Sequence, residues 1–151
     1  MGYYDDPIRE EYYLPSAAFG ATTDSLKIIG PKGKKGLVRD IEVALTADAV
    51  GTTTVPEIDV GATSGATEYA RFRLGTSATA GYAAANSPFR ASQIGGNTLI
   101  DGSPSYEDYT GHVMMGTAFI PADTAVFITR KAGTGGTPAG TGAVRVIIDW
   151  F

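Results

Sequence analysis

Apolar and polar residues alternate with a period of two in several short segments, which is the pattern of β-strands half-buried in a sheet. In the segment 67–75, Ala70, Phe72 and Leu74 share one face, and we expect that face to point inward. The segment 143–150 gathers its apolar residues on one face in the same way: Val144, Val146, Ile148 and Trp150. Both segments therefore predict strands with one side in a core.

Further strands are predicted where β-branched and aromatic residues stand between turn residues. They cover the ranges 25–30, 36–47, 53–61, 112–120 and 124–132, with a short strand around 98–100. In 36–47, a common phase runs through Leu37, Ile41, Val43 and Leu45. Arg39 interrupts this phase, which predicts a β-bulge there. Pro56 predicts that 53–61 is an edge or bulged strand, because proline cannot donate a ladder hydrogen bond.

About eight strands and no segment of helical period indicate an all-β fold, an antiparallel two-sheet sandwich of jelly-roll type. The glycine-rich run Gly133–Gly142 is interpreted as a hairpin loop between two strands, and most of 75–110 as loop. We expect two parts in the chain: an extended N-terminal arm over residues 1–20 and a β-sandwich domain over residues 21–151.

The expected arm, "MGYYDDPIREEYYLPSAAFG", has neither a helical nor a strand period. Tyrosine is depleted in disordered segments and enriched at interfaces, so the arm is predicted to pack on its own subunit or on another. Its candidate partner-binding residues are Tyr3, Tyr4, Asp5, Asp6, Arg9, Glu10, Glu11, Tyr12 and Tyr13, with a local net charge of -3.

A basic turn, "PKGKKG", covers Pro31–Gly36 and supplies three more candidate partner-binding residues, Lys32, Lys34 and Lys35. The stretch 24–40 around this turn has a net charge of +3. The arm and this stretch thus carry opposite net charges, and oppositely charged patches on one chain favour self-complementary contacts in an oligomer. Two solvated patches are the alternative, and a turn that binds phosphate would show a steep salt dependence.

Composition narrows the class of protein. The chain has 151 residues, 43% of them hydrophobic and 19% charged, which is enough for one domain with a core and a surface rich in small neutral residues. Cysteine is absent, which excludes disulfides and thiolate sites and favours synthesis in a reducing cytoplasm. Residues 1–20 show no signal-peptide pattern, and no apolar run is long enough for a membrane span. The net charge of -4 argues against nucleic acid as a partner.

Catalytic and cofactor motifs are weak. His112 is the single histidine, so a catalytic triad or a histidine-rich metal site has little to build on. The acidic pairs Asp5-Asp6, Glu10-Glu11 and Glu107-Asp108 are interpreted as solvated charges. Neither glycine-rich stretch has the spacing and the following helix of a phosphate loop. We expect no enzyme activity, no cofactor and no metal.

The segment "FIPADTAVFITRKAGTGGTPAGTGAVRVIIDW" combines a strand, a proline-containing turn, a second strand, a Gly/Thr/Ala/Pro loop and a closing strand. In this it resembles the C-terminal end of head decoration, or cement, proteins of tailed bacteriophages. The resemblance covers about the last 35 residues; the rest matches in general character only. It implies a jelly-roll virion protein, often trimeric, that binds the major capsid protein on the outer capsid surface and clamps neighbouring capsomers without catalysis.

Two other functions remain open from the sequence. One is a tail, collar or fibre-associated virion module. The other is a carbohydrate-binding jelly roll with an aromatic platform of Tyr82, Tyr106 and Tyr109. Trp150 and Phe151 are expected to complete the core, with contact to a neighbouring subunit as the alternative.

Overall fold

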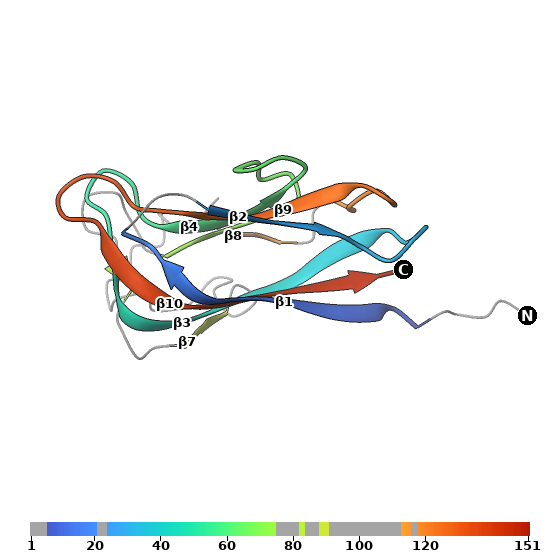
Figure 1. The fold of residues 1–151 in the computed structure, drawn as a ribbon, viewed down its shortest axis with the longest axis horizontal. Coiled ribbons are helices and arrows are strands. Elements are labelled where there is room, and N and C mark those ends of the chain that lie inside the picture. The colour runs from blue at the N-terminus through green and yellow to red at the C-terminus, as the bar shows by residue number, and fades with distance from the viewer. Residues whose placement is uncertain (1–5, 21–23, 75–81, 84–87, 91–112, 116–117) are drawn as a thin grey trace, which may run out of the picture.

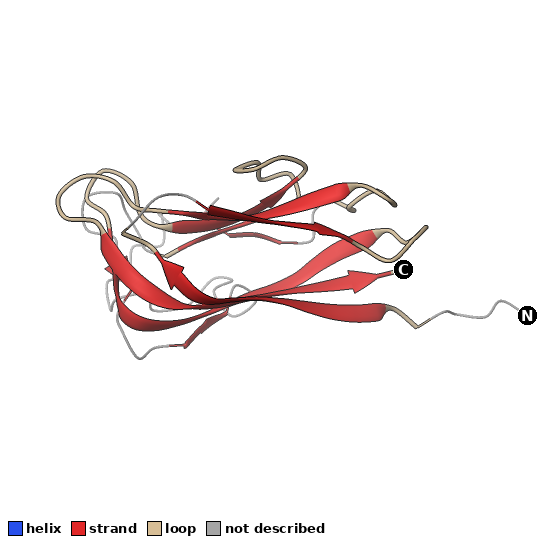
Figure 2. Cartoon of the chain, in the orientation of Figure 1, coloured by secondary structure: helices blue, strands red, loops and turns tan. Residues whose placement is uncertain are grey.

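The computed structural model describes residues 6–20, 24–74, 82–83, 88–90, 113–115 and 118–151. Within these residues the chain is built from strands and connecting loops, with no helix (Figure 2). The strands are β1 (Ile8–Ala18), β2 (Asp24–Ile29), β3 (Gly36–Val50), β4 (Glu57–Gly61), β5 (Ala70–Arg73), β6 (Tyr82–Ala83), β7 (Pro88–Arg90), β8 (Val113–Met115), β9 (Ala125–Lys131) and β10 (Ala139–Trp150). The all-β prediction is confirmed. The expected count of about eight strands stays a prediction, because the predicted strand at 98–100 lies outside the described residues.

Two antiparallel sheets form the two layers of a sandwich (Figure 1). Sheet A has the order β1-β10-β3-β6, with β7 also paired to β3, and sheet B has the order β2-β9-β4-β5-β8. Strands that are neighbours in sequence are therefore often in different sheets. The first described strand pairs with the last one along its length, from Ile8 opposite Trp150 to Ala18 opposite Thr141.

The core lies between the layers because the strands alternate as expected. Ala70, Phe72 and Leu74 are fully buried, as predicted, and β10 contributes its predicted apolar face: Val144, Val146, Ile148 and Trp150. The other inward side chains come from both sheets, among them Ile41 and Val43 of β3, Ile58 and Val60 of β4, and Val126 and Ile128 of β9.

The bulge predicted in β3 is confirmed, and it changes which residue points inward. Ile147 pairs with Asp40 and Ile148 with Val38, so no residue of β10 stands opposite Arg39 in the register of the two strands. The extra residue reverses the alternation before it. Val38 is therefore buried, and Leu37, which was expected inside, is only half-buried.

Two further expectations were wrong. The strand after Pro56 is central in sheet B, between β9 and β5. Pro56 is compatible with that place because β4 begins one residue later, at Glu57, so no ladder hydrogen bond is lost.

The run Gly133–Gly142 is not a hairpin loop: it carries the chain from β9 in sheet B to β10 in sheet A, and its last four residues already belong to β10.

The segment predicted as an arm enters the sandwich. Residues 8–18 form β1, an edge strand of sheet A, and Leu14 and Tyr12 pack against the core. A β-bulge interrupts its pairing between Leu14 and Ala17, at Pro15 and Ser16. Proline and a bulge are common means of protecting an edge strand from pairing with other chains.

Candidate interaction surface

The predicted arm residues divide into three groups. Tyr3, Tyr4 and Asp5 lie outside the described residues. Asp6 is exposed and precedes β1. The other five lie in β1 itself: Arg9, Glu10, Glu11, Tyr12 and Tyr13. Before the bulge in β1, Arg9, Glu11 and Tyr13 face outward, away from sheet B, and Glu10, Tyr12 and Leu14 face the core side, opposite buried residues of β10. The bulge reverses this order, and Ala17 is buried.

Arg9 binds the end of β10. Its Nε and Nη2 donate hydrogen bonds to the two carboxylate oxygens of Asp149, at 2.8 and 3.0 Å. Arg39, the bulge residue of β3, places its Nε 3.0 Å from the same carboxylate. The hydrogen bond from Arg9 and its charge, helped by Arg39, lower the pKa of Asp149 below its usual value although burial opposes this. One buried carboxylate therefore links three neighbouring strands of sheet A: β1, β10 and β3.

Substitution Asp149→Asn tests this link. Because the pKa of Asp149 is lower in the folded protein than in the unfolded chain, its stabilising effect is complete above the unfolded value of about 3.9 and is lost as the pH falls through the folded value. We expect Asn to lower the free energy of unfolding by about 1–3 kcal/mol near neutral pH. The difference from wild type should shrink below about pH 4 in denaturant titrations.

The matched control for this experiment is Asp6→Asn, which changes an exposed aspartate before β1. Its unfolding free energy near neutral pH should equal that of wild type. An Asp149→Asn difference that stayed constant down to about pH 2 would show that the carboxylate does not contribute through its charge.

The other charges of β1 also have partners within the same chain. Arg145 of β10 lies between Glu11, at 3.1 Å, and Glu42 of β3, at 2.5 Å, and its guanidinium is 6.0 Å from the centre of the Tyr13 ring. On the inner side, the Tyr12 hydroxyl donates to Glu10. Burial, and then this hydrogen bond, raise the pKa of Tyr12 well above its usual value. Three of the charged residues predicted to contact a partner, Arg9, Glu10 and Glu11, therefore have partners within the same chain.

The basic turn is held rigidly at one end of the sandwich. The Lys34 N–H donates to the Pro31 carbonyl at 3.1 Å, and Gly33 has a positive φ of 75°, which glycine adopts without strain. The Gly33 N–H donates to Asp123 Oδ1 at 2.9 Å, which ties this turn to the turn before β9. Lys32 and Lys35 are exposed.

An apolar rim lies at the same end, and we define it as Ile8, Phe119 and Phe151. These three side chains are 43%, 59% and 47% exposed. The two phenylalanine rings meet edge to face, with centroids 6.4 Å apart. Ile8 is opposite Trp150 on the neighbouring strand, next to Phe151 in sequence. Exposed aromatic residues that lie together are typical of contact surfaces rather than of a bare monomer surface.

Main-chain hydrogen bonds join the rim to the basic turn. Lys35 and Phe151 exchange two, at 2.8 and 3.0 Å, and Gly36 and Ile120 exchange two more, at 2.8 and 3.0 Å. The turn between β2 and β3, the end of β10 and the start of β1 all lie at the right-hand end in Figure 1. The basic turn (Pro31–Gly36) and the apolar rim therefore form one surface, called here the basic–apolar end.

The sequence predicted only part of this surface. It singled out the lysines through their clustering, but it did not identify Ile8 and Phe119. Alternation with the buried Ile120 was the available signal for Phe119.

Of the last two residues, which were both expected to complete the core, Trp150 is buried as expected, while Phe151 is half-exposed. The aromatic platform predicted for a carbohydrate site cannot be compared, because Tyr106 and Tyr109 lie outside the described residues.

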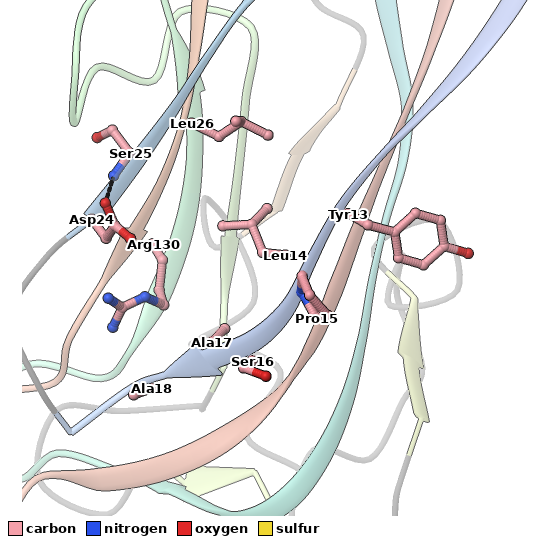
Figure 3. A pocket seen from close by; sticks show the side chains of 10 residues that line it. All are labelled: Tyr13, Leu14, Pro15, Ser16, Ala17, Ala18, Asp24, Ser25, Leu26 and Arg130. Carbon is pink, nitrogen blue, oxygen red and sulfur yellow. Dashed lines mark hydrogen bonds between the residues drawn. The ribbon is translucent and has the colours of Figure 1, made fainter.

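A shallow pocket of about 370 Å³ lies along the open side of the sandwich, between the edge strands β1 and β2 (Figure 3). Leu14, Leu26 and Arg130 point into the space between the strands, and Tyr13 points away from it. Five of its lining residues are apolar, namely Leu14, Pro15, Ala17, Ala18 and Leu26, and the other five are Tyr13, Ser16, Asp24, Ser25 and Arg130.

A second cluster of charges joins three strands on the outer face of sheet B. Glu57 and Asp59 of β4 contact Arg71 and Arg73 of β5 and Lys131 of β9. The Asp59 side chain is fully buried, and burial raises its pKa despite its hydrogen bonds to Lys131 and Arg71. This arrangement pairs each carboxylate with cations and so is typical of a structural network.

Two other properties of the described residues bear on function. No group of three or more histidine, aspartate and glutamate side chains is arranged to hold a metal ion in this part of the chain. A helix able to cross a membrane is likewise absent from the ranges that the structure covers. His112 and the pair Glu107-Asp108 lie outside those ranges.

Comparison with known proteins gives little evidence about the function of this surface. No protein-family model matches the chain, and no curated protein matches it. A chain in the acidic stable capsid structure of Helicobacter pylori bacteriophage KHP30 is similar at 11% identity, over 94% of this chain and 93% of that chain, with a TM-score of 0.30. A TM-score this low does not establish a shared fold, and the surface described above has to be interpreted from its own chemistry.

Proposed function

We propose that this protein is a structural component of a bacteriophage particle that binds the outer capsid surface and stabilises contacts between capsomers, without catalysis. The observation that carries the proposal is the basic–apolar end, a rigid surface with exposed aromatic rings and lysines on an all-β sandwich. Such a surface suits contact with another protein. The resemblance of residues 119–150 to bacteriophage decoration proteins supplies the kind of particle.

The strand order supports the jelly-roll part of the proposal. Each sheet alternates strands from the two ends of the chain: β1 pairs with β10, and β2 pairs with β9. Next in each sheet comes a strand from the middle of the chain, β3 in sheet A and β4 in sheet B. Rolling a long antiparallel hairpin into two sheets gives this order, and double-sheet jelly rolls are common in viral capsid proteins and lectins.

Attachment to the capsid protein is assigned to the apolar rim. Phe119 and Phe151 are about half-exposed, and burying aromatic rings at the centre of an interface supplies much of the binding free energy in protein complexes. Many copies on one shell would then raise the barrier to rupture, because each copy binds the assembled state.

The test is binding of the purified protein to empty expanded capsids of the virus that encodes it, measured by co-sedimentation. We expect saturable binding, and at least about tenfold weaker binding for a Phe119→Ala, Phe151→Ala variant, since about 1.4 kcal/mol is a factor of ten. The control is Phe127→Ala, which removes a ring from the outer face of β9. No binding by the wild-type protein would contradict the capsid role.

Location in the particle separates this proposal from a tail, collar or fibre-associated module. Purified virions can be dissociated into heads and tails and the protein detected by mass spectrometry in each fraction. Recovery with heads supports decoration of the capsid, and recovery with tails would replace it by the alternative virion role.

A further inference from the structure

The two edge strands beside the pocket differ in how they are protected from pairing with other chains. β1 carries Pro15 and a β-bulge between Leu14 and Ala17. β2 contains no proline and pairs with β9 through its whole length without a shift in register. Within the part of the chain that the structure describes, no strand pairs with the other side of β2. The edge of β2 is therefore regular enough to accept a further strand.

The register of sheet B shows which main-chain groups of β2 point to this edge. In an antiparallel ladder, successive residues direct their N–H and C=O groups alternately to one neighbouring strand and to the other. The Leu74 N–H donates to the Pro56 carbonyl at 2.8 Å, so even-numbered residues of β4 bond to β5, and Asp59 bonds to β9. Thr129, opposite Asp59, therefore bonds to β4, and Ser25, opposite Thr129, directs its main-chain groups to the free edge.

Lys27 and Ile29 direct their main-chain groups to the same edge by this alternation. The Ser25 N–H is accepted by the Asp24 side chain at 2.8 Å, which agrees with its position at the edge. Lys27 and Ile29 thus each present a donor and an acceptor there, and Ser25 presents its carbonyl. These groups recur at every second residue, which is the spacing that a further antiparallel strand requires.

The side chains around this edge form two different surfaces. On the inner side, Leu26 and Ile28 are half-buried against the core, and Leu26 points into the pocket together with Leu14 of β1 (Figure 3). On the outer side, Lys27 is exposed, with its ammonium group 6.0 Å from the centre of the Phe127 ring. A strand added here would place its side chains alternately against an apolar wall and beside a positive charge.

We propose that β2 binds an extended segment of another protein, which joins sheet B as a further antiparallel strand through main-chain hydrogen bonds. Apolar side chains at alternate positions of that segment enter the pocket beside Leu26. An acidic side chain of the segment lies opposite Lys27 on the outer face, where unlike charges on paired strands attract each other. This binding site does not depend on the virion role.

A second copy of β2 fits this edge less well than such a segment. Pairing about a two-fold axis has to keep inner side chains opposite inner ones. With the axis at Lys27, Leu26 lies opposite Ile28, but the two copies of Lys27 face each other, and like charges directly opposite are destabilising. With the axis at Leu26, the Asp24 carboxylate lies opposite the apolar Ile28. The charge pattern of β2 therefore favours an acidic partner segment.

Titration of the purified full chain with a designed peptide tests the site. The probe is a capped heptapeptide of sequence Ser-Thr-Val-Glu-Val-Thr-Ser, which places its valines on one face and its glutamate on the other. Binding is followed through the NMR shifts of the protein amides. We expect saturable binding with the largest shifts in β2, and at least about threefold weaker binding when lysine replaces the glutamate of the peptide.

Two substitutions at Ile29 separate the main-chain contact from the side chain. Ile29 is 62% exposed, and proline is compatible with an edge strand where its nitrogen faces away from the ladder, so Ile29→Pro and Ile29→Ala should both stay folded in denaturant titrations. Proline removes the donor and places its ring where the added strand would lie. We expect at least about tenfold weaker peptide binding for Ile29→Pro, and a change of less than about threefold for Ile29→Ala.

Four results would overturn the proposal. They are equal binding of the two peptides, equal binding by the two variants, the absence of shifts in β2 at about 1 mM peptide, and slow hydrogen exchange of the Lys27 and Ile29 amides in the free protein. The last result would show that the chain itself covers this edge. A wild-type dimer that Ile29→Pro dissociates would likewise replace the partner segment by a second copy, and light scattering detects it.

Discussion

Replacing Trp150 by alanine is expected to lower the free energy of unfolding by about 3–5 kcal/mol, which is a large part of the stability of a domain of this size. Trp150 is 1% exposed and is among the largest fully buried side chains. Its ring fills space that Gly30 and Gly36 leave open. An ideal Cβ placed on Gly30 would lie 2.4 Å from Cη2 of the indole, and one placed on Gly36 would lie 2.5 Å from Cζ3. Alanine at 150 would leave a cavity that these glycines cannot fill. Chemical denaturation monitored by far-ultraviolet circular dichroism measures the loss.

The neighbouring residue gives the matched control. Phe151 is 47% exposed, and its main-chain hydrogen bonds with Lys35 do not require the ring. Phe151→Ala removes the edge-to-face contact with Phe119 and should cost about 1 kcal/mol or less. Equal losses for the two variants would mean that the rim, and not the indole, supports this end of the core.

Replacing Gly135 by alanine is expected to cost about 2–4 kcal/mol, the second largest of the effects predicted here. Gly135 lies in the crossover from β9 to β10 with a positive φ of 77°. An added Cβ would also lie 2.8 Å from the main-chain nitrogen of Thr53, in the loop before β4. Both the left-handed backbone and the close approach of two chain segments therefore disfavour any side chain. The unfolding free energy from denaturant titration is the measurement.

Gly33→Ala separates these two causes. Gly33 has nearly the same φ, 75°, but an added Cβ there would meet no atom within 4 Å. Only the backbone penalty applies, partly offset by the reduced freedom of the unfolded chain, so the expected cost is about 1 kcal/mol. The difference between the variants measures the close packing of the crossover. If Gly135→Ala cost no more than Gly33→Ala, the crossover would have room to relax.

Alternation of side chains made much of the fold predictable. It identified the inward faces of β5 and β10, because in both strands every second residue is apolar and a sheet buries one face. It also located the bulge at Arg39, where a charged residue broke the apolar phase of β3. It could not decide which side of the bulge kept the phase, because Leu37 and Val38 are equally apolar.

Pairing between distant strands was not predictable from local patterns. The residues of β1 show weak alternation because Glu10 faces the core side at the sheet edge, where Tyr12 satisfies it, and so the strand resembled a free arm. The loop after β9 resembled a hairpin because its composition is that of a tight turn. Whether two strands joined by a short loop pair with each other or enter different sheets depends on all the other strands.

For the candidate surface, the sequence predicted the charges but not which of them were available. Arg9 and Glu11 were expected to contact another molecule, yet each has its partner on β10. The pairs join residues more than 130 positions apart in the chain, and only the register of β1 against β10 brings them together. Lys32 and Lys35 of the basic turn are exposed, because no strand in the described part of the chain covers this turn.

The crossover into β10 has a consequence for how the protein acquires its structure. β10 lies between β1 and β3 in sheet A, so the latest of these three strands to be synthesised separates two that are made much earlier. Until residues 139–150 have left the exit tunnel, β1 has no partner in its sheet, and its exposed backbone is a target for pairing with other nascent chains. Folding is therefore expected to be slow, because closure of the sandwich requires β1 to pair with β10, a strand that lies far from it in the sequence.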